Sequence, residues 1–195
     1  MNSFFLGFEK KAAEVVYHGS SAKVKVLKPR NIHGNPRSGD ILFASPHAGM
    51  SLAYTGKKYG DADIHQSYYY KDGKKVFTLE EMRPGALDET YKGRKGYLYT
   101  LPADKFKTDP EWRFGGGLIS SEKVTPYRTE VIADIPKRLK EEGVVLKKFN
   151  PSSPTRQTKV KRMREMVESM APDWRREYLD WVGETNPELK KELLK

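Results

Sequence analysis

The sequence predicts an α+β protein with a helical C-terminal tail, and three observations lead to this prediction. Short runs of β-branched and aromatic residues fill most of residues 1–149. Helical patterns between them are too few for a repeated βαβ layout, so the sheet should be antiparallel or mixed. After the proline- and serine-containing linker at 150–157, apolar residues recur at helical spacing. We therefore expect one main domain over 1–149 and a linker with helical tail over 150–195.

Each strand of the main domain is predicted from an apolar run bounded by Gly, Pro or Asp. The expected strands are residues 14–18, 40–44, 67–70, 74–79, 96–101, 116–121 and 128–135. The dipeptide Asp72-Gly73 suits a tight hairpin turn between two of them. Helices are expected over 45–59, with Ser45 as the N-cap, and over 134–143, with Gly143 as the stop signal.

The tail pattern predicts helices that bury their apolar residues. One set of residues recurs at three- and four-residue spacing, namely Val160, Met163, Val167 and Met170. Trp174 and Trp181 lie seven residues apart, so one helical face should bury both. Asn186 and Pro187 resemble the cap and first residue of a terminal helix. The tail should dock on the main domain or on a protein partner.

Composition excludes several kinds of chemistry. The chain has no cysteine, which rules out disulfides, thiol nucleophiles and Cys-based zinc sites, and its four histidines show no metal-ligand spacing. We expect no metal. No apolar run reaches the length of a membrane span, and we find no export signal, so we expect a cytoplasmic protein that does not contact the membrane. The net charge of +10 either attracts acidic partners such as nucleic acid or serves solubility.

Two segments read together resemble the donor-site motifs of the ADP-ribosyltransferase superfamily. The first is "YHGSS" at 17–21, where a predicted strand ends in His-Gly-Ser. The second is "GDILFASPHAGMSLAY" at 39–54, where a strand leads into a helix that carries a serine and a tyrosine. Order, residue types and strand-to-helix context are similar to the His-Tyr-Glu branch, which includes poly(ADP-ribose) polymerases and diphtheria-type toxins. The resemblance implies that family's split β-sheet core and the use of NAD as ADP-ribose donor.

The resemblance also implies roles for individual residues. His18 would bond the adenosine ribose, with Ser20 beside it in the same motif, and the Gly19 backbone would hold the nicotinamide carboxamide. Ser51 would add a hydroxyl to that carboxamide, and the Tyr54 ring would stack on the nicotinamide. Taken singly, a strand-end histidine and a helix tyrosine are more often packing residues.

The third motif residue should be a glutamate on a later strand, and two candidates exist. Glu122 directly follows the apolar run "LISS", while Glu130 lies in the run that leads to the next helix. We favour Glu122 as the catalytic residue and keep Glu130 as the alternative. Its carboxylate would stabilise the sugar cation that forms when nicotinamide leaves.

The cationic loop after His18 offers contacts for the NAD pyrophosphate. Candidates are Lys28, Arg30 and Arg37, although a solvated charged loop explains each of them equally well. The run "SYYYK" at 67–71 is either a stacking platform for bases or a half-buried strand.

These features together predict an NAD-dependent ADP-ribosyltransferase. A short chain favours mono-ADP-ribosylation over polymer growth, and the acceptor would be an acidic protein or a nucleic acid. One alternative is an NAD glycohydrolase, in which water is the acceptor. The other is a binding or structural module without catalysis, such as a phage virion component.

Overall fold

The structure, a computed structural model, describes residues 15–30, 40–56, 60, 62–108 and 117–195. The β-structure of these residues forms three separate sheets of three strands each. The first sheet has the order β1-β5-β8 and is antiparallel throughout, with strands β1 (Val15–Ser20), β5 (Gly96–Pro102) and β8 (Arg128–Ile132). The predicted α+β class is thus confirmed.

The second sheet lies beside the first. It has the order β2-β7-β6 and comprises β2 (Leu42–Ala44), β7 (Leu118–Ser120) and β6 (Lys107–Thr108). Tyr17 of β1 and Ser45, just after β2, exchange backbone hydrogen bonds of 2.8 and 2.9 Å. This bridge fixes the end of β2 against β1, so the two predicted motifs become neighbours.

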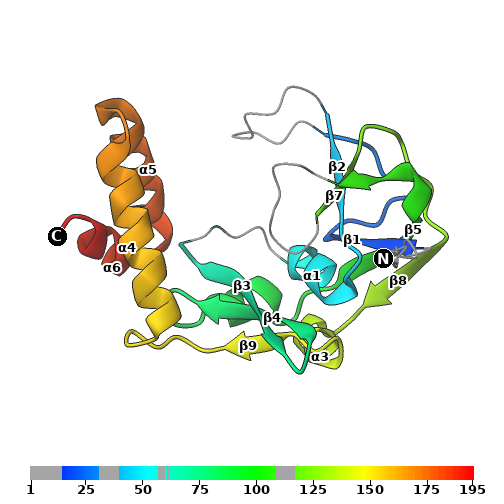
Figure 1. The fold of residues 1–195 in the computed structure, drawn as a ribbon, viewed down its shortest axis with the longest axis horizontal. Coiled ribbons are helices and arrows are strands. Elements are labelled where there is room, and N and C mark those ends of the chain that lie inside the picture. The colour runs from blue at the N-terminus through cyan, green and yellow to red at the C-terminus, as the bar shows by residue number, and fades with distance from the viewer. Residues whose placement is uncertain (1–14, 31–39, 57–59, 61, 109–116) are drawn as a thin grey trace, which may run out of the picture.

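The third sheet is built on a long hairpin. Strands β3 (Ile64–Lys71) and β4 (Lys74–Glu81) are antiparallel, and β9 (Val145–Lys147) pairs with β4 in parallel. Asp72 and Gly73 have φ of 51° and 73°, the left-handed values that a tight two-residue hairpin turn needs. In Figure 1 this sheet lies between the first two sheets and the C-terminal helices.

Short helices cover the main domain and longer ones form the tail. The main-domain helices are α1 (Ala48–Leu52), α2 (Ala86–Tyr91) and α3 (Ile135–Glu141), with 3₁₀ turns η1 (Ala53–Thr55) and η2 (Ala103–Lys105). The tail consists of α4 (Pro154–Ser169), α5 (Pro172–Thr185) and α6 (Pro187–Leu193). In the described part of the chain, every helix is too short or too polar to cross a membrane.

The tail packs on the main domain through a small apolar contact and one buried asparagine. Its core contains Val160, Met163 and Val167, as predicted, and it continues onto Ala62 and Met82 beside the third sheet.

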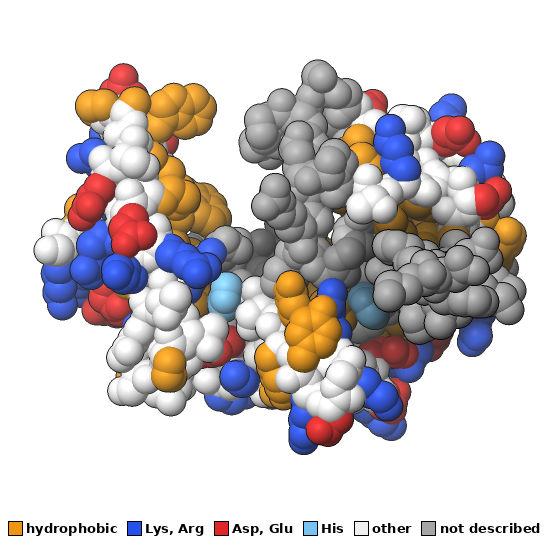
Figure 2. All heavy atoms as spheres, viewed as in Figure 1, with side chains coloured by type: hydrophobic (Ala, Val, Ile, Leu, Met, Phe, Trp, Pro, Cys, Tyr) orange, Lys and Arg blue, Asp and Glu red, His pale blue; other side chains and the backbone are white. Residues whose placement is uncertain are grey.

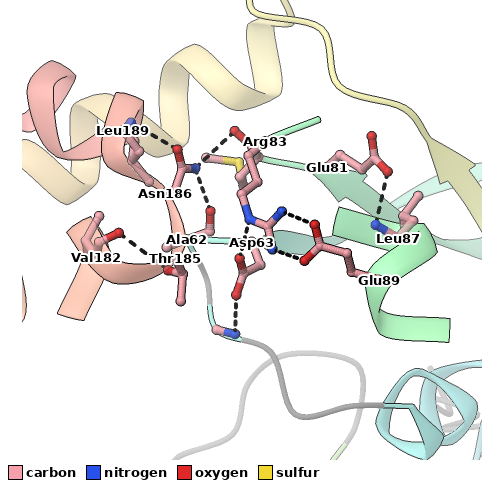
Figure 3. A network of polar contacts seen from close by, with 12 residues as sticks. Ala62, Asp63, Glu81, Arg83, Leu87, Glu89, Val182, Thr185, Asn186 and Leu189 are labelled. Carbon is pink, nitrogen blue, oxygen red and sulfur yellow. Dashed lines mark hydrogen bonds and ion pairs between the residues drawn. The ribbon is translucent and has the colours of Figure 1, made fainter. Parts of the chain in front are cut away.

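Asn186 caps α6, where its Oδ1 accepts from Leu189 N at 3.0 Å. Its Nδ2 donates to the carbonyls of Ala62 at 2.9 Å and Met82 at 3.4 Å, as Figure 3 shows. The predicted cap therefore also joins the tail to the main domain.

Several sequence-based details are wrong. The linker expected at 150–157 ends earlier, because α4 begins at Pro154, and the helix expected over 45–59 is the short α1 followed by the 3₁₀ turn η1. Ser45 does not occupy the N-cap of α1, which is His47; instead the Ser45 hydroxyl accepts from His47 N at 3.0 Å, because the chain is still bridged to β1 at Ser45. Trp174 and Trp181 are not buried together: they are 71% and 39% exposed, and the buried face of α5 carries Leu179 and Val182. A seven-residue spacing alone did not identify the buried face.

Candidate functional site

The end of β1 and the helix α1 form the candidate donor site. Gly19 is the fifth residue of β1, and a Cβ placed on it would lie 1.8 Å from the Ser51 carbonyl oxygen. Only glycine allows α1 to come this close to the strand. The Ser51 hydroxyl adds a second tie, since it donates to the Tyr17 carbonyl at 2.8 Å. The glycine and the serine of the two motifs are therefore in direct contact.

His18 points to the opposite face of β1, because successive strand residues alternate in direction. Its Nδ1 lies 2.7 Å from the Phe43 carbonyl oxygen of β2, and its ring lies 6.2 Å from that of Tyr99. A carbonyl only accepts, so Nδ1 carries the proton and donates. In the neutral ring this leaves a lone pair on Nε2, which can accept a hydrogen bond from a hydroxyl such as that of a ribose.

The surroundings of His18 favour that neutral form. Burial lowers the pKa of His18 most, the hydrogen bond to the Phe43 carbonyl raises it, and the nearby positive charge of Arg30 lowers it further. Of the candidate pyrophosphate ligands, Arg30 is held next to β2, because its backbone exchanges hydrogen bonds of 3.1 and 3.2 Å with Ile41. Arg37 lies outside the described residues.

Ser20 and Tyr54 lie at the edges of this region. The Ser20 hydroxyl accepts from Ala22 N at 3.1 Å and so shapes the turn after β1. Tyr54 belongs to η1, directly after α1, and is 45% exposed. Its hydroxyl lies 3.3 Å from Gln66 Oε1 on β3. One helical turn separates Tyr54 from Ser51.

Glu122 lies away from α1. The strands β2 and β7 are antiparallel, with Ala44 opposite Leu118 and Leu42 opposite Ser120. Since β2 runs toward α1, β7 runs away from it, and Glu122 follows the distal end of β7. Its side chain is 63% exposed and pairs with Lys105 at 3.2 Å. The structure does not bring Glu122 into contact with Ser51 or Tyr54.

Glu130 lies in the same sheet as Gly19. In register, Gly19 is opposite Leu98, and Leu98 is opposite Glu130. Cross-strand partners share a face, so Glu130 and Gly19 both belong to the face that α1 covers, about 10 Å apart across two strand spacings. The Glu130 carboxylate pairs with Arg138 of α3 at 3.4 Å. Of the two candidates, Glu130 is the one on the α1 face, although neither contacts Ser51 or Tyr54.

Sequence analysis missed a second polar region, between β3 and α4. A hollow of about 370 Å³ is lined by His65, Pro154, Thr155, Thr158, Lys159 and Arg162. The four side chains after the proline have the spacing of one helical face. The sequence analysis did not find this face, because it assigned Thr155 to the linker.

Within the described ranges, no group of three His, Asp or Glu side chains gathers as a metal site. The candidate donor site consists of the end of β1, the bridge to β2 and the α1–η1 segment. Comparison with known protein families, curated proteins and solved structures found no match to this chain.

Proposed function

We propose that the protein binds NAD beside the end of β1, at the edge where this strand meets the α1–η1 segment, and transfers ADP-ribose to an acceptor. The observation that carries the proposal is the contact between the two motifs, in which Gly19 lies directly against the backbone of Ser51. His18 precedes Gly19 in β1, and Tyr54 follows Ser51 by three residues. In the proposed complex the neutral His18 accepts from a ribose hydroxyl, and Tyr54 stacks on the nicotinamide.

The proposed reaction breaks the bond between nicotinamide and ribose C1′. Nicotinamide leaves with the bonding electrons, and the acceptor's nucleophile forms a new bond to C1′ while it loses a proton. The transition state resembles a sugar cation, as in glycoside hydrolysis, so a carboxylate near C1′ lowers the barrier. Glu122 remains our first candidate from the motif resemblance, and Glu130 is the alternative that the register of the first sheet supports.

The position of Glu122 favours a second candidate function. A carboxylate that is mostly exposed and paired with Lys105 at the distal end of β7 is not held against the proposed nicotinamide site. A module that binds a dinucleotide without catalysis would have this arrangement. The two functions differ in one observable, the release of free nicotinamide.

The test of binding uses the full chain and titrates NAD by calorimetry. Replacing Tyr54 with Ala should weaken binding by about 1–3 kcal/mol, the usual value of a base–aromatic contact. Tyr127→Ala is the matched control, because Tyr127 is 70% exposed and belongs to neither motif. Equal affinity of the two variants would remove Tyr54 from the site, and the absence of NAD binding by the unaltered chain would refute the proposal.

The test of catalysis measures nicotinamide release with NAD alone and with cell extract. Release only with extract supports transfer, release with NAD alone indicates a glycohydrolase, and binding without release favours the non-catalytic module. Glu122→Gln and Glu130→Gln keep side-chain size and remove the charge. The variant of the catalytic glutamate should lose roughly 10²-fold in turnover with NAD affinity nearly unchanged. If neither variant loses activity, neither glutamate is catalytic.

A further inference from the structure

Strand β8 forms an open edge of the first sheet. It pairs with β5 on one side, and no strand within the described ranges pairs with its other side. In Figure 1, β8 lies at the end of the molecule opposite the tail helices. The edge of a sheet presents unpaired N–H and C=O groups, so a strand of another molecule can add to it.

The hydrogen-bonding pattern of the first sheet determines which backbone groups of β8 lie on this open side. Tyr17 exchanges its backbone hydrogen bonds with Ser45, so its groups point away from β5. The next residue, His18, then directs its groups toward its β5 partner Tyr99. Because Tyr99 faces β1, its partner on β8, Thr129, directs its N–H and C=O away from β5. Thr129 therefore presents a donor and an acceptor on the open edge.

The side chains around Thr129 form a self-complementary pattern. When two copies of β8 pair antiparallel about a twofold axis at Thr129, residues equally distant from it on its two sides lie opposite each other. Arg128 of each copy then faces Glu130 of the other copy, so one favourable charge pair occurs twice. Registers centred on Arg128 or Glu130 would instead place like charges opposite each other, which destabilises strand pairing.

The charges needed for this cross-strand pair are available. Arg128 is exposed, and among the described residues it has no acidic partner. Glu130 pairs with Arg138 of α3 at 3.4 Å. Arg138 also pairs with Glu142 at 2.7 Å and with Glu141 at 3.9 Å. One guanidinium thus serves three carboxylates, so a second cation beside Glu130 is favourable.

Exposed apolar groups and mixed charge at this end of the molecule also fit a second copy. Val131 is 54% exposed and Tyr127, directly before β8, is 70% exposed, and the same pairing brings Val131 of one copy beside Tyr127 of the other. Figure 2 shows cationic and acidic side chains interspersed on the end of the molecule away from the tail. A surface of mixed charge suits an equally mixed surface better than it suits a polyanion.

We propose that two copies of this chain associate through β8, which joins their three-stranded sheets into one continuous antiparallel sheet. Each Thr129 N–H donates to the Thr129 carbonyl of the other copy, and Arg128 of each copy pairs with Glu130 of the other. One pair of five-residue strands buries less surface than a standard interface, so the dimer is weak and forms at high protein concentration. It forms without NAD, and its test does not depend on the proposed function.

Analytical ultracentrifugation of the full chain without NAD should show a mass that rises with concentration from 22.4 kDa toward twice that value. Arg128→Glu places like charges opposite each other at two symmetry-related positions and should raise the dimer Kd roughly tenfold or more. Glu130→Lys should have the same effect for the same reason. The matched control is Lys137→Glu, which makes the same charge change at an exposed residue of α3 and should leave Kd nearly unchanged.

An equal mixture of the Arg128→Glu and Glu130→Lys chains tests the register directly. In a mixed dimer each cation again faces an acid, so the mixture should dimerise although each variant alone stays monomeric. Thr129→Pro tests the backbone pairing, because it removes the N–H on the open edge. Proline is tolerated on an edge strand where the N–H faces solvent, so this variant should lose the dimer and keep its melting temperature.

A single species of 22.4 kDa at every concentration would overturn the proposal. So would failure of the mixture to dimerise, or equal weakening by Lys137→Glu. Trp174 is 71% exposed on α5 and offers a rival apolar contact. A dimer that Trp174→Ala dissociates and Arg128→Glu leaves intact would also refute association through β8. Melting temperatures of all variants confirm that each one is folded.

Discussion

The candidate NAD site and the tail junction are both held by hydrogen bonds to backbone, but they differ in how their residues are spread along the chain. At the proposed NAD site, the contacts join residues 17–19 to residues 43–51, and the sequence analysis singled out both segments. At the junction, Asn186 bonds to the carbonyls of Ala62 and Met82, which lie more than 100 residues away. Local sequence patterns therefore indicated the two segments that meet in the first region, but not the carbonyls that Asn186 contacts in the second.

The buried acids of the third sheet show the same difference. Glu80 and Glu81 are 1% and 2% exposed, although glutamates are usually on the surface. The Glu81 carboxylate accepts hydrogen bonds from Leu87 N at 3.0 Å and from Phe149 N at 2.9 Å. It therefore binds the backbone of α2 and of the segment just before the linker. In the sequence, a polar residue that accepts hydrogen bonds from distant backbone N–H groups cannot be distinguished from a polar residue on the surface.

The largest expected effect comes from the close contact between β1 and α1 at the proposed NAD site. Gly19→Ala should destabilise the protein by about 3 kcal/mol or more, because the new methyl group meets the backbone of α1, which cannot simply rotate away. The control is Gly143→Ala, where φ is 75° and no atom lies within 4 Å of the added carbon. It should cost roughly 1 kcal/mol, the strain of a left-handed residue. Chemical denaturation compares the two, and equal costs would mean that α1 is not held against β1.

The tail junction should show the next largest effect. Asn186→Ala removes the cap of α6 and leaves buried carbonyls without their donor, which together should cost about 2–4 kcal/mol. Asp134→Ala serves as control, because Asp134 caps α3 through Lys137 N at 3.0 Å and is exposed. That change should cost about 1 kcal/mol. If both variants unfold with the same loss of free energy, Asn186 acts only as a cap and the tail is weakly attached.

The smallest expected effect is a pH dependence at His18. Burial lowers its pKa below 6.5 in the folded protein, so the unfolded chain takes up a proton first as the pH falls. The free energy of unfolding should be highest above that value and decrease as the pH drops from about 6.5 toward the folded pKa.

The variant that checks this is His18→Asn, which keeps a donor for Phe43 and cannot titrate. It should lose less stability on acidification than the unaltered chain. His47 also has a pKa lowered first by its burial and then by Lys75, so His47→Asn measures the remaining contribution. Identical acid sensitivity of the His18 variant and the unaltered chain would contradict the burial of a neutral His18.

Local patterns correctly predicted most elements. The Asp72-Gly73 turn, the Gly143 stop and the Asn186 cap depend on the conformations of adjacent residues, which the sequence specifies directly. Helix α2 and strands β6 and β9 were not predicted, because all three are short. The two strands are stabilised by pairing with segments far along the chain or outside their own run.

By itself the sequence determined the α+β class, the helical tail and the motif residues around Gly19, because spacing and turn chemistry act over a few neighbours. Only the tertiary structure decided which faces are buried and where the end of β7 next to Glu122 lies relative to α1. The antiparallel pairing of β2 with β7 directs Glu122 away from α1, while the pairing of β5 with β8 places Glu130 on the α1 face. Strand direction and register depend on partners far along the chain, which no local pattern contains.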